Sequence, residues 1–254
     1  MGSGRHSIFE TVSLVLCAGT VGASAGLAAT QPQKAEVQIN LCSTPDETVK
    51  QLHLEPMRAE RYEVWYFETT DMALFRSGIV ARMRIKGRST ELTLKFADQD
   101  CARIAPALLP DPQSKCEYDV RGASAAGAVS ISRALSDVQL RSLHANPENL
   151  QAMLSPAQIH FLRNEALVWP LPAPLVRLGP ARVQPYRRTG DEFVVEAWQF
   201  PSGLNLLEIS QKAKLSSAPD LNKDLQARLT RHQVAICTDQ GSPAGAKLRD
   251  LLGR

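Results

Sequence analysis

The sequence lacks the short motifs that mark several common catalytic classes. It contains no P-loop, so the phosphate cradle of P-loop NTPases is not expected. No two cysteines stand at C-x-x-C spacing and the histidines show no metal-binding spacing, which argues against zinc-type sites. The net charge is only +3, which excludes a strongly basic nucleic-acid-binding surface but permits a local positive site.

The chain is long enough to bury a substantial core. It has 254 residues, of which 44% are hydrophobic, so one large domain or two small ones could form. We find no internal repeat and no low-complexity tract. The two groups of predicted strands share one pattern, so we expect a single domain over residues 36–254.

The N-terminal segment has the pattern of an export signal. Arg5 and His6 precede a short apolar stretch that ends at Ala23-Ser24-Ala25, an A-x-A cleavage pattern. We therefore predict a signal peptide over residues 1–25, a linker over 26–35, and an exported protein, periplasmic or secreted, without stable membrane insertion. A buried or anchoring N-terminal helix is the alternative.

Four cysteines remain after signal removal. Three pairings of Cys42, Cys101, Cys116 and Cys237 are possible. We favour Cys101–Cys116, because a proline-containing loop joins two predicted strands there, which leaves Cys42 to pair with Cys237. In an oxidising compartment each bridge would stabilise the fold by about 2–4 kcal/mol. Four buried free thiols are the alternative.

Charged and apolar residues alternate along two neighbouring segments, 79–86 and 91–96. One face of the first segment is basic (Arg82, Arg84, Lys86) and the other is apolar, which is typical of a strand with one face against a core. Two cations about 6 Å apart repel by roughly 3 kcal/mol at an effective dielectric of about 20. Such a face needs carboxylates beside it or an anionic ligand. A solvated outer surface is the alternative.

Hydrophobic periodicity and turn residues predict the remaining elements. We expect strands near 37–42, 62–68, 78–86, 91–96, 116–121, 181–188, 192–200 and 204–210. Helices are expected over 43–54, as a helical insertion at about 132–166, and over 220–234 and 243–252. Trp65 and Tyr66 should point in opposite directions, one of them against a helix.

The order of these features resembles the CYTH domain, the superfamily of triphosphate tunnel enzymes. Residues 61–71 (RYEVWYFETTD) are similar to its Y-F-D-T segment, and 74–84 (LFRSGIVARMR) to its L-x-x-x-G-x-x-L-R-x-R strand. Residues 91–95 (ELTLK) are similar to its T-x-K strand, and 206–210 (LLEIS) to its L-E-I-E motif. The resemblance implies an α+β fold, in which a closed antiparallel β-barrel with a polar lumen, the tunnel, is flanked by helices.

The resemblance also implies functional residues. Arg82, Arg84 and Lys95 match the positions that hold phosphate, and Arg182 and Arg187 or Arg188 are further candidates for the same role. Trp198 stands where a polar lumen group is expected, which predicts that it fills part of the tunnel. Glu36 and Glu208 match catalytic carboxylates and, with Asp119, could hold Mg²⁺ or Mn²⁺.

The acidic motifs are thinned relative to the family pattern. The E-x-E-x-K strand corresponds to Glu36-Val37-Gln38-Ile39-Asn40, with its second acid and its lysine replaced, and Ser210 replaces the last acid of L-E-I-E. Neutral Gln and Ser remove charge that would hold a metal before phosphate arrives. We therefore expect an exported tunnel barrel that binds a phosphate-rich anion: triphosphate, polyphosphate or an organophosphate. An active metal-dependent triphosphatase or polyphosphatase, and a purely structural interaction module, are the alternatives.

Overall fold

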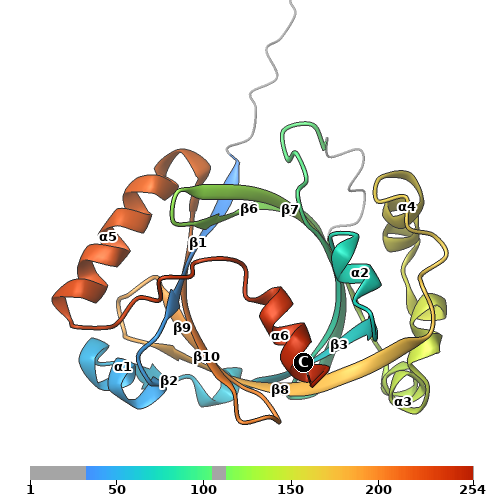
Figure 1. Ribbon diagram of the computed structural model, residues 1–254, viewed down its shortest axis with the longest axis horizontal. Helices are drawn as coiled ribbons and strands as arrows, with labels where there is room; N and C mark the ends of the chain where they lie inside the picture. The colour runs from blue at the N-terminus through green and yellow to red at the C-terminus, as the bar shows by residue number, and fades with distance from the viewer. Residues whose placement is uncertain (1–32, 105–112, 254) are drawn as a thin grey trace, which may run out of the picture. The chain divides into compact units, whose positions relative to one another are not determined.

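Nine strands close into a barrel in the computed structural model, which describes residues 33–104 and 113–253 (Figure 1). The predicted signal peptide and most of the linker lie outside the described residues. In ring order the strands are β8 (Leu175–Arg187), β3 (Tyr62–Thr69), β4 (Ile79–Lys86), β5 (Ser89–Phe96), β7 (Ser124–Ala134), β6 (Ser114–Arg121), β1 (Lys34–Leu41), β10 (Asn205–Lys214) and β9 (Val194–Gln199), which returns to β8. The two-residue β2 (Glu55–Pro56) pairs with β8 outside the ring.

The closed barrel with flanking helices confirms the predicted α+β fold. Neighbouring strands of the ring run antiparallel except β1 and β6, which are parallel, so the sheet is mixed. The parallel pair closes the ring where the first strand of the chain meets a strand from its middle.

Helices lie on two sides of the barrel and at its centre. In Figure 1, α3 and α4 flank one side, α1 and α5 flank the other, and α6 lies within the ring. The helices are α1 (Pro45–Leu52), α2 (Ala73–Arg76), α3 (Asp137–Ala145), α4 (Pro156–Asn164), α5 (Ala218–Arg231) and α6 (Ala244–Leu251), with 3-10 turns η1 (Arg58–Glu60), η3 (Pro147–Met153) and η4 (Leu215–Ser217). None of the helices in the described ranges is long and apolar enough to cross a membrane.

Local sequence explains where the helices begin. Thr44, Ser136 and Ser155 each form a capping box, in which the hydroxyl accepts from the third backbone N–H of the helix and the Glu or Gln there reaches back. The last two begin α3 and α4, which with η3 form the predicted helical insertion.

Strand β7 is the element that the sequence did not predict. Its first part is rich in small residues, Ala125-Ala126-Gly127-Ala128, and carries little strand propensity. Packing explains it: a Cβ at Gly127 would stand 1.9 Å from the carbonyl oxygen of Gln99, whose N–H donates to the Gly127 carbonyl. The strand is paired on both sides, with β5 and with β6, and the glycine leaves room for the Gln99 backbone.

The two faces of the barrel wall have different partners. Met83, Leu92 and Ile131 belong to an outer core that includes Leu143 of α3 and Phe161 of α4. A second outer core packs β1, β9 and β10 against α1 and α5. Along each strand, every second side chain packs into one of these outer cores. The side chains between them, including the cations of β4 and β5, therefore face the lumen.

The lumen is only partly polar. An inner core of Tyr62, Tyr66, Trp198 and Phe200 packs against Leu248 of α6. Trp65 points the other way and meets His144 of α3 with ring centroids 5.2 Å apart. The opposite orientations of Trp65 and Tyr66 are thus confirmed, and part of the lumen is filled by apolar groups and α6.

Both predicted disulfides are present. Cys101 pairs with Cys116 across a separation of 15 residues, and Cys42 pairs with Cys237 across 195. The second bridge ties the end of β1 to the segment that leads into α6, next to the Leu41–Ile236 bridge.

Candidate functional site

Two arginines of β4 line the lumen without an acidic partner. Arg82 lies opposite Tyr66 and Arg84 opposite Val64, and both neighbours belong to the inner core. The Arg84 guanidinium lies 4.6 Å from the centroid of the Tyr62 ring, and its Nε atom is buried without a hydrogen-bond partner. Within the described residues, neither arginine forms an ion pair. Both positive charges are therefore available to an anion.

A third cation without an ion-pair partner among the described residues, Lys247, comes from α6. The Lys247 side chain is buried, and its ammonium nitrogen lies 3.3 Å from the centroid of the Trp198 ring. Burial lowers the pKa of Lys247 to about 8, although the carboxylates of Glu208 and Glu196 partly oppose this shift. Sequence reasoning missed this lysine, because nothing in an amphipathic C-terminal helix indicates that it enters a barrel.

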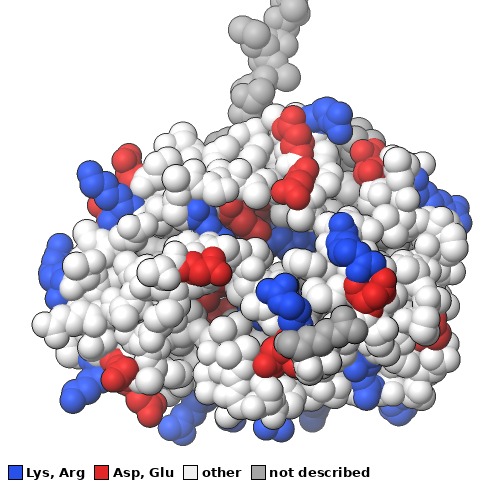
Figure 2. Space-filling view, in the orientation of Figure 1, with Lys and Arg blue, Asp and Glu red and all other residues white. Residues whose placement is uncertain are grey.

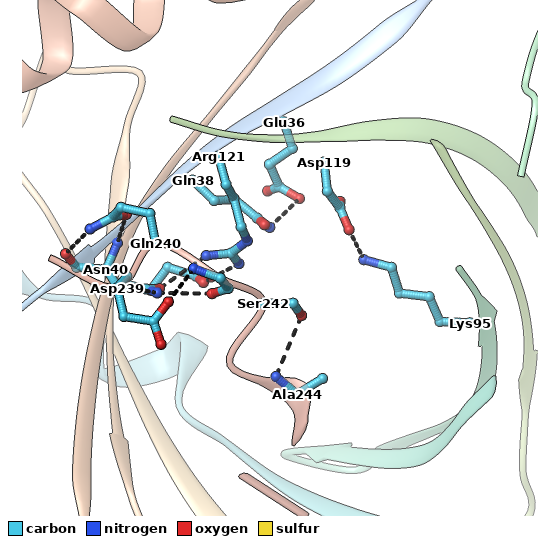
Figure 3. Close-up of polar contacts among 12 residues, drawn as sticks. Glu36, Gln38, Asn40, Lys95, Asp119, Arg121, Asp239, Gln240, Ser242 and Ala244 are labelled. Carbon is cyan, nitrogen blue, oxygen red and sulfur yellow. Dashed lines mark hydrogen bonds and ion pairs between the residues drawn. The ribbon is translucent and has the colours of Figure 1, made fainter. Parts of the chain in front are cut away.

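The remaining predicted phosphate-binding residues are placed differently. Lys95 reaches into the lumen and forms an ion pair with Asp119, so its charge is already matched (Figure 3). Arg182 faces outward, pairs with Glu63 at 3.5 Å and has a side chain 72% exposed. Arg188 is exposed in the turn after β8, as Arg187 is at the end of that strand. The structure corrects Arg182, which does not face the lumen, whereas Arg187 and Arg188 remain predictions.

The three predicted metal ligands face the lumen, but each contacts a basic side chain. Glu36 pairs with Lys212 at 3.2 Å, Asp119 with Lys95, and Glu208 with Arg121. In the part of the chain that the structure describes, no three His, Cys, Asp or Glu side chains are grouped to hold a metal ion. The donor set therefore does not fit the divalent metal that the tunnel fold implies.

Arg121 is a second residue that sequence reasoning missed. Its Nη1 donates to Asn40 Oδ1 at 2.9 Å, and the other arm of the guanidinium contacts Glu208. The signal was available, because Arg121 follows Asp119 by two residues in a predicted strand and must share its face. Figure 2 shows the resulting mixture, with basic and acidic side chains close together around the centre of this face.

Asn40 connects this network to the C-terminal segment. Its backbone N–H donates to Gln240 Oε1 at 2.8 Å, and its Nδ2 donates to the carbonyls of Asp239 and Gly241 (Figure 3). These bonds hold the chain that enters the lumen as α6. Asn40, at the position of the family lysine, thus supports the C-terminal segment.

A further carboxylate faces Glu208 from the neighbouring strand. Glu196 of β9 lies directly opposite Glu208, and its Oε1 accepts a hydrogen bond of 2.6 Å from the Tyr62 hydroxyl. Burial, followed by the charge of Glu196, raises the pKa of Tyr62 above its ordinary value. Burial likewise raises the pKa of Tyr66 to about 12. Both phenols therefore stay neutral donors at physiological pH.

A cavity of about 600 Å³ has Tyr62, Val183 and Trp198 of the inner core in its lining. Glu63, Arg182, Gln199 and Asn205 line it. These residues follow one another across β3, β8, β9 and β10 on the outward face. The cavity therefore borders both the outward face of these strands and rings of the inner core.

Comparison with known proteins identifies the fold. No protein-family model and no curated protein matches the sequence. Among solved structures, the chain is similar to a provisionally assigned adenylyl cyclase from Hippeastrum described as having a dominant triphosphatase activity. The TM-score is 0.59 at 14% identity, covering 86% of this chain and 96% of that one. A provisionally assigned adenylate cyclase from Bacillus halodurans is similar with a TM-score of 0.54 at 15% identity, covering 83% and 96%.

These likenesses establish a class of fold. The chain has the CYTH-like tunnel fold, the barrel that the sequence resemblance implied.

Proposed function

We propose that this protein binds a phosphate-rich anion, such as tripolyphosphate, polyphosphate or an organophosphate, inside the barrel. The observation that carries the proposal is that Arg82, Arg84 and Lys247 enter one lumen without an ion-pair partner among the described residues. Positive charges that are buried, as in Lys247, or half-buried, as in Arg82 and Arg84, raise the free energy of the empty protein when they lack counterions. An anion that reaches them removes that cost and gains charge-assisted hydrogen bonds.

Two arginines and one lysine suit phosphate chemically. A guanidinium presents several N–H donors in a plane, which matches two oxygens of a phosphoryl group, whereas an ammonium acts as a compact point charge. The partners of the two best-placed cations are aromatic rings, Tyr62 for Arg84 and Trp198 for Lys247. A π face attracts a cation less strongly than a phosphate does, so both groups can exchange partners.

Titration calorimetry with tripolyphosphate tests the proposal. The double variant Arg82→Ala, Arg84→Ala should weaken binding by about 100-fold or more, because each arginine that no longer donates a charge-assisted hydrogen bond to the anion costs roughly 1.4 kcal/mol. Arg141→Ala is the matched control, because Arg141 is exposed on α3 outside the barrel. Unchanged affinity in the double variant would instead favour a structural module, whose charges serve stability alone.

A metal-dependent triphosphatase or polyphosphatase is the second candidate. The observation that favours it is the pair of carboxylates, Glu196 and Glu208, facing each other across β9 and β10. Phosphate release from tripolyphosphate should then occur with Mg²⁺ or Mn²⁺, stop on chelation, and disappear in Glu208→Gln. For the binding protein, no release is expected under any of these conditions.

We also propose that the protein works on the exported side of a membrane. The two disulfides support this, since such bonds persist in oxidising compartments. Fractionation of cells that express the full chain, with N-terminal sequencing of the mature protein, tests both export and cleavage after residue 25.

A further inference from the structure

The acidic wall of the lumen, formed by β1, β6 and β10, carries its own cations. Glu36, Asp119 and Glu208 each contact a lysine or arginine that comes from another strand. Strand β4, which carries Arg82 and Arg84, is separated from β6 by β5 and β7 in the ring. The lumen thus contains two arginines without an ion-pair partner among the described residues, with Glu91 opposite Arg84 in register, and three acids that each contact a cation.

Arg121 is the most firmly held of these cations. It and Glu208 are both largely buried, with side chains 12% exposed. The guanidinium spans two acceptors, the Glu208 carboxylate and Asn40 Oδ1. Asn40 is itself fixed by four hydrogen bonds that it shares with residues 239–241. A divalent ion at Glu208 would have to displace a guanidinium that two fixed oxygens hold.

Lys212 contacts two neighbouring carboxylates, Glu36 and Glu117, in the same way. Its ammonium nitrogen lies 3.2 Å from Glu36 Oε2 and 3.0 Å from Glu117 Oε2. Glu36 also accepts a hydrogen bond of 3.3 Å from Gln38, which stands where the family pattern has an acid. The same carboxylate oxygen of Glu36 is therefore engaged by an ammonium and an amide.

The polar substitutions and the ion pairs point to the same change. Gln38 and Ser210 stand where the family pattern has acids, so β1 keeps only Glu36 and β10 keeps only Glu208. One basic side chain contacts each of these two carboxylates. Glu196 is the remaining acid beside Glu208, and it accepts from Tyr62. Glu36, Asp119 and Glu208 each contact a cation, which leaves Glu196 as the acid of this group whose partner is neutral, whereas a hard divalent ion prefers several oxygen ligands.

We propose that Arg121 and Lys212 take the place of the divalent metal of triphosphate tunnel enzymes, so that this lumen binds its anion without metal. This inference rests on the proposed anion binding and adds its mode of charge neutralisation. The fixed cations hold the acidic wall neutral and prevent the carboxylates from repelling the ligand.

The first experiment measures binding of tripolyphosphate to the full chain by calorimetry, in EDTA and then with excess Mg²⁺. Because Mg²⁺ also binds tripolyphosphate, the ligand concentration is corrected for that complex. After the correction we expect the affinities in EDTA and in Mg²⁺ to agree within about twofold. Binding in Mg²⁺ alone would overturn the inference and leave the proposed function standing. No binding in either condition would instead overturn the proposed function.

A second experiment removes the fixed cation and does not depend on the anion. Titration of Mn²⁺ alone, followed by electron paramagnetic resonance, should detect no binding to the native protein. Arg121→Met frees Glu208 beside Glu196 and should create a Mn²⁺ site, and Arg121→Met with Glu208→Gln should lose it again. Tight Mn²⁺ binding by the native protein that Glu208→Gln abolishes would refute the inference. Lys212→Met, at a more exposed position, repeats the test if Arg121→Met does not fold.

Discussion

The ammonium group of Lys247 rests on the face of Trp198, 3.3 Å from the centroid of its ring. α6 brings the lysine into the barrel, while β9 supplies the tryptophan. A cation held by an aromatic face is stabilised by about 2 kcal/mol or more when desolvated, less than a full ion pair with a ligand can provide. This relationship links the C-terminal helix to the proposed anion site and leads to the first two predictions.

Lys247 should contribute directly to affinity. Lys247→Met preserves the length and apolar packing of the side chain but removes its charge, and should weaken tripolyphosphate binding about tenfold, which corresponds to roughly 1.4 kcal/mol. Lys223→Met, at an exposed position of α5, is the control. Ligand addition should also change tryptophan fluorescence, and Trp198→Phe should abolish that change. If Trp198→Phe still shows the same fluorescence change when the ligand is added, the ligand does not bind beside Trp198.

Anion affinity should fall as the pH rises through about 8. Burial lowers the pKa of Lys247 to about 8 in the free protein, so the lysine is charged below that pH and loses its charge above it. Because the bound anion stabilises the charged form, it raises this pKa, and binding takes up a proton above pH 8. Calorimetry at pH 9 in two buffers with different ionisation enthalpies measures that uptake.

Lys247→Arg provides the control for this pH dependence. The guanidinium stays charged throughout the range, so its variant should bind without the proton uptake of the lysine. Identical proton uptake in both proteins would assign the titration to the ligand or to another group.

The two disulfides should contribute unequally to stability. In the chain-entropy account, the Cys42–Cys237 bridge, which spans 195 residues, is worth about 5 kcal/mol, and the Cys101–Cys116 bridge, which spans 15, about 3 kcal/mol. Denaturant unfolding of the paired Cys→Ser variants measures both. The long-range variant should also lose anion affinity, because its bridge anchors the segment that leads to Lys247. Equal losses of affinity in the two variants would contradict that role.

Gly127→Ala should destabilise the barrel by about 2–3 kcal/mol, since the added methyl group overlaps a backbone oxygen that cannot move away freely. The new Cβ would stand 1.9 Å from the Gln99 carbonyl oxygen. Ala125→Ser, at an exposed position two residues earlier, should change the free energy of unfolding by less than about 0.5 kcal/mol. A stable Gly127→Ala protein would show that the neighbouring loop can shift.

Much of the barrel follows from alternation along the chain. Residues 79–86 and 91–96 have period-two patterns, and these patterns predicted both strands and the basic face of the first. Strand β7 escaped prediction because its residues are small, and its pairing depends on contacts with Gln99 and with β5 and β6.

The residue pattern also favoured the two disulfides and put Arg82 and Arg84 on one strand face, since side chains two apart on a strand share a face, and the family resemblance implied that this face and Lys95 point inward. It could not reveal which charges remain without partners. Arg121 and Glu208 are 87 residues apart, and Lys247 reaches the lumen because α6 folds back into the ring. Strand closure brings such distant groups together, and this proximity decides which cations are neutralised and which can hold an anion.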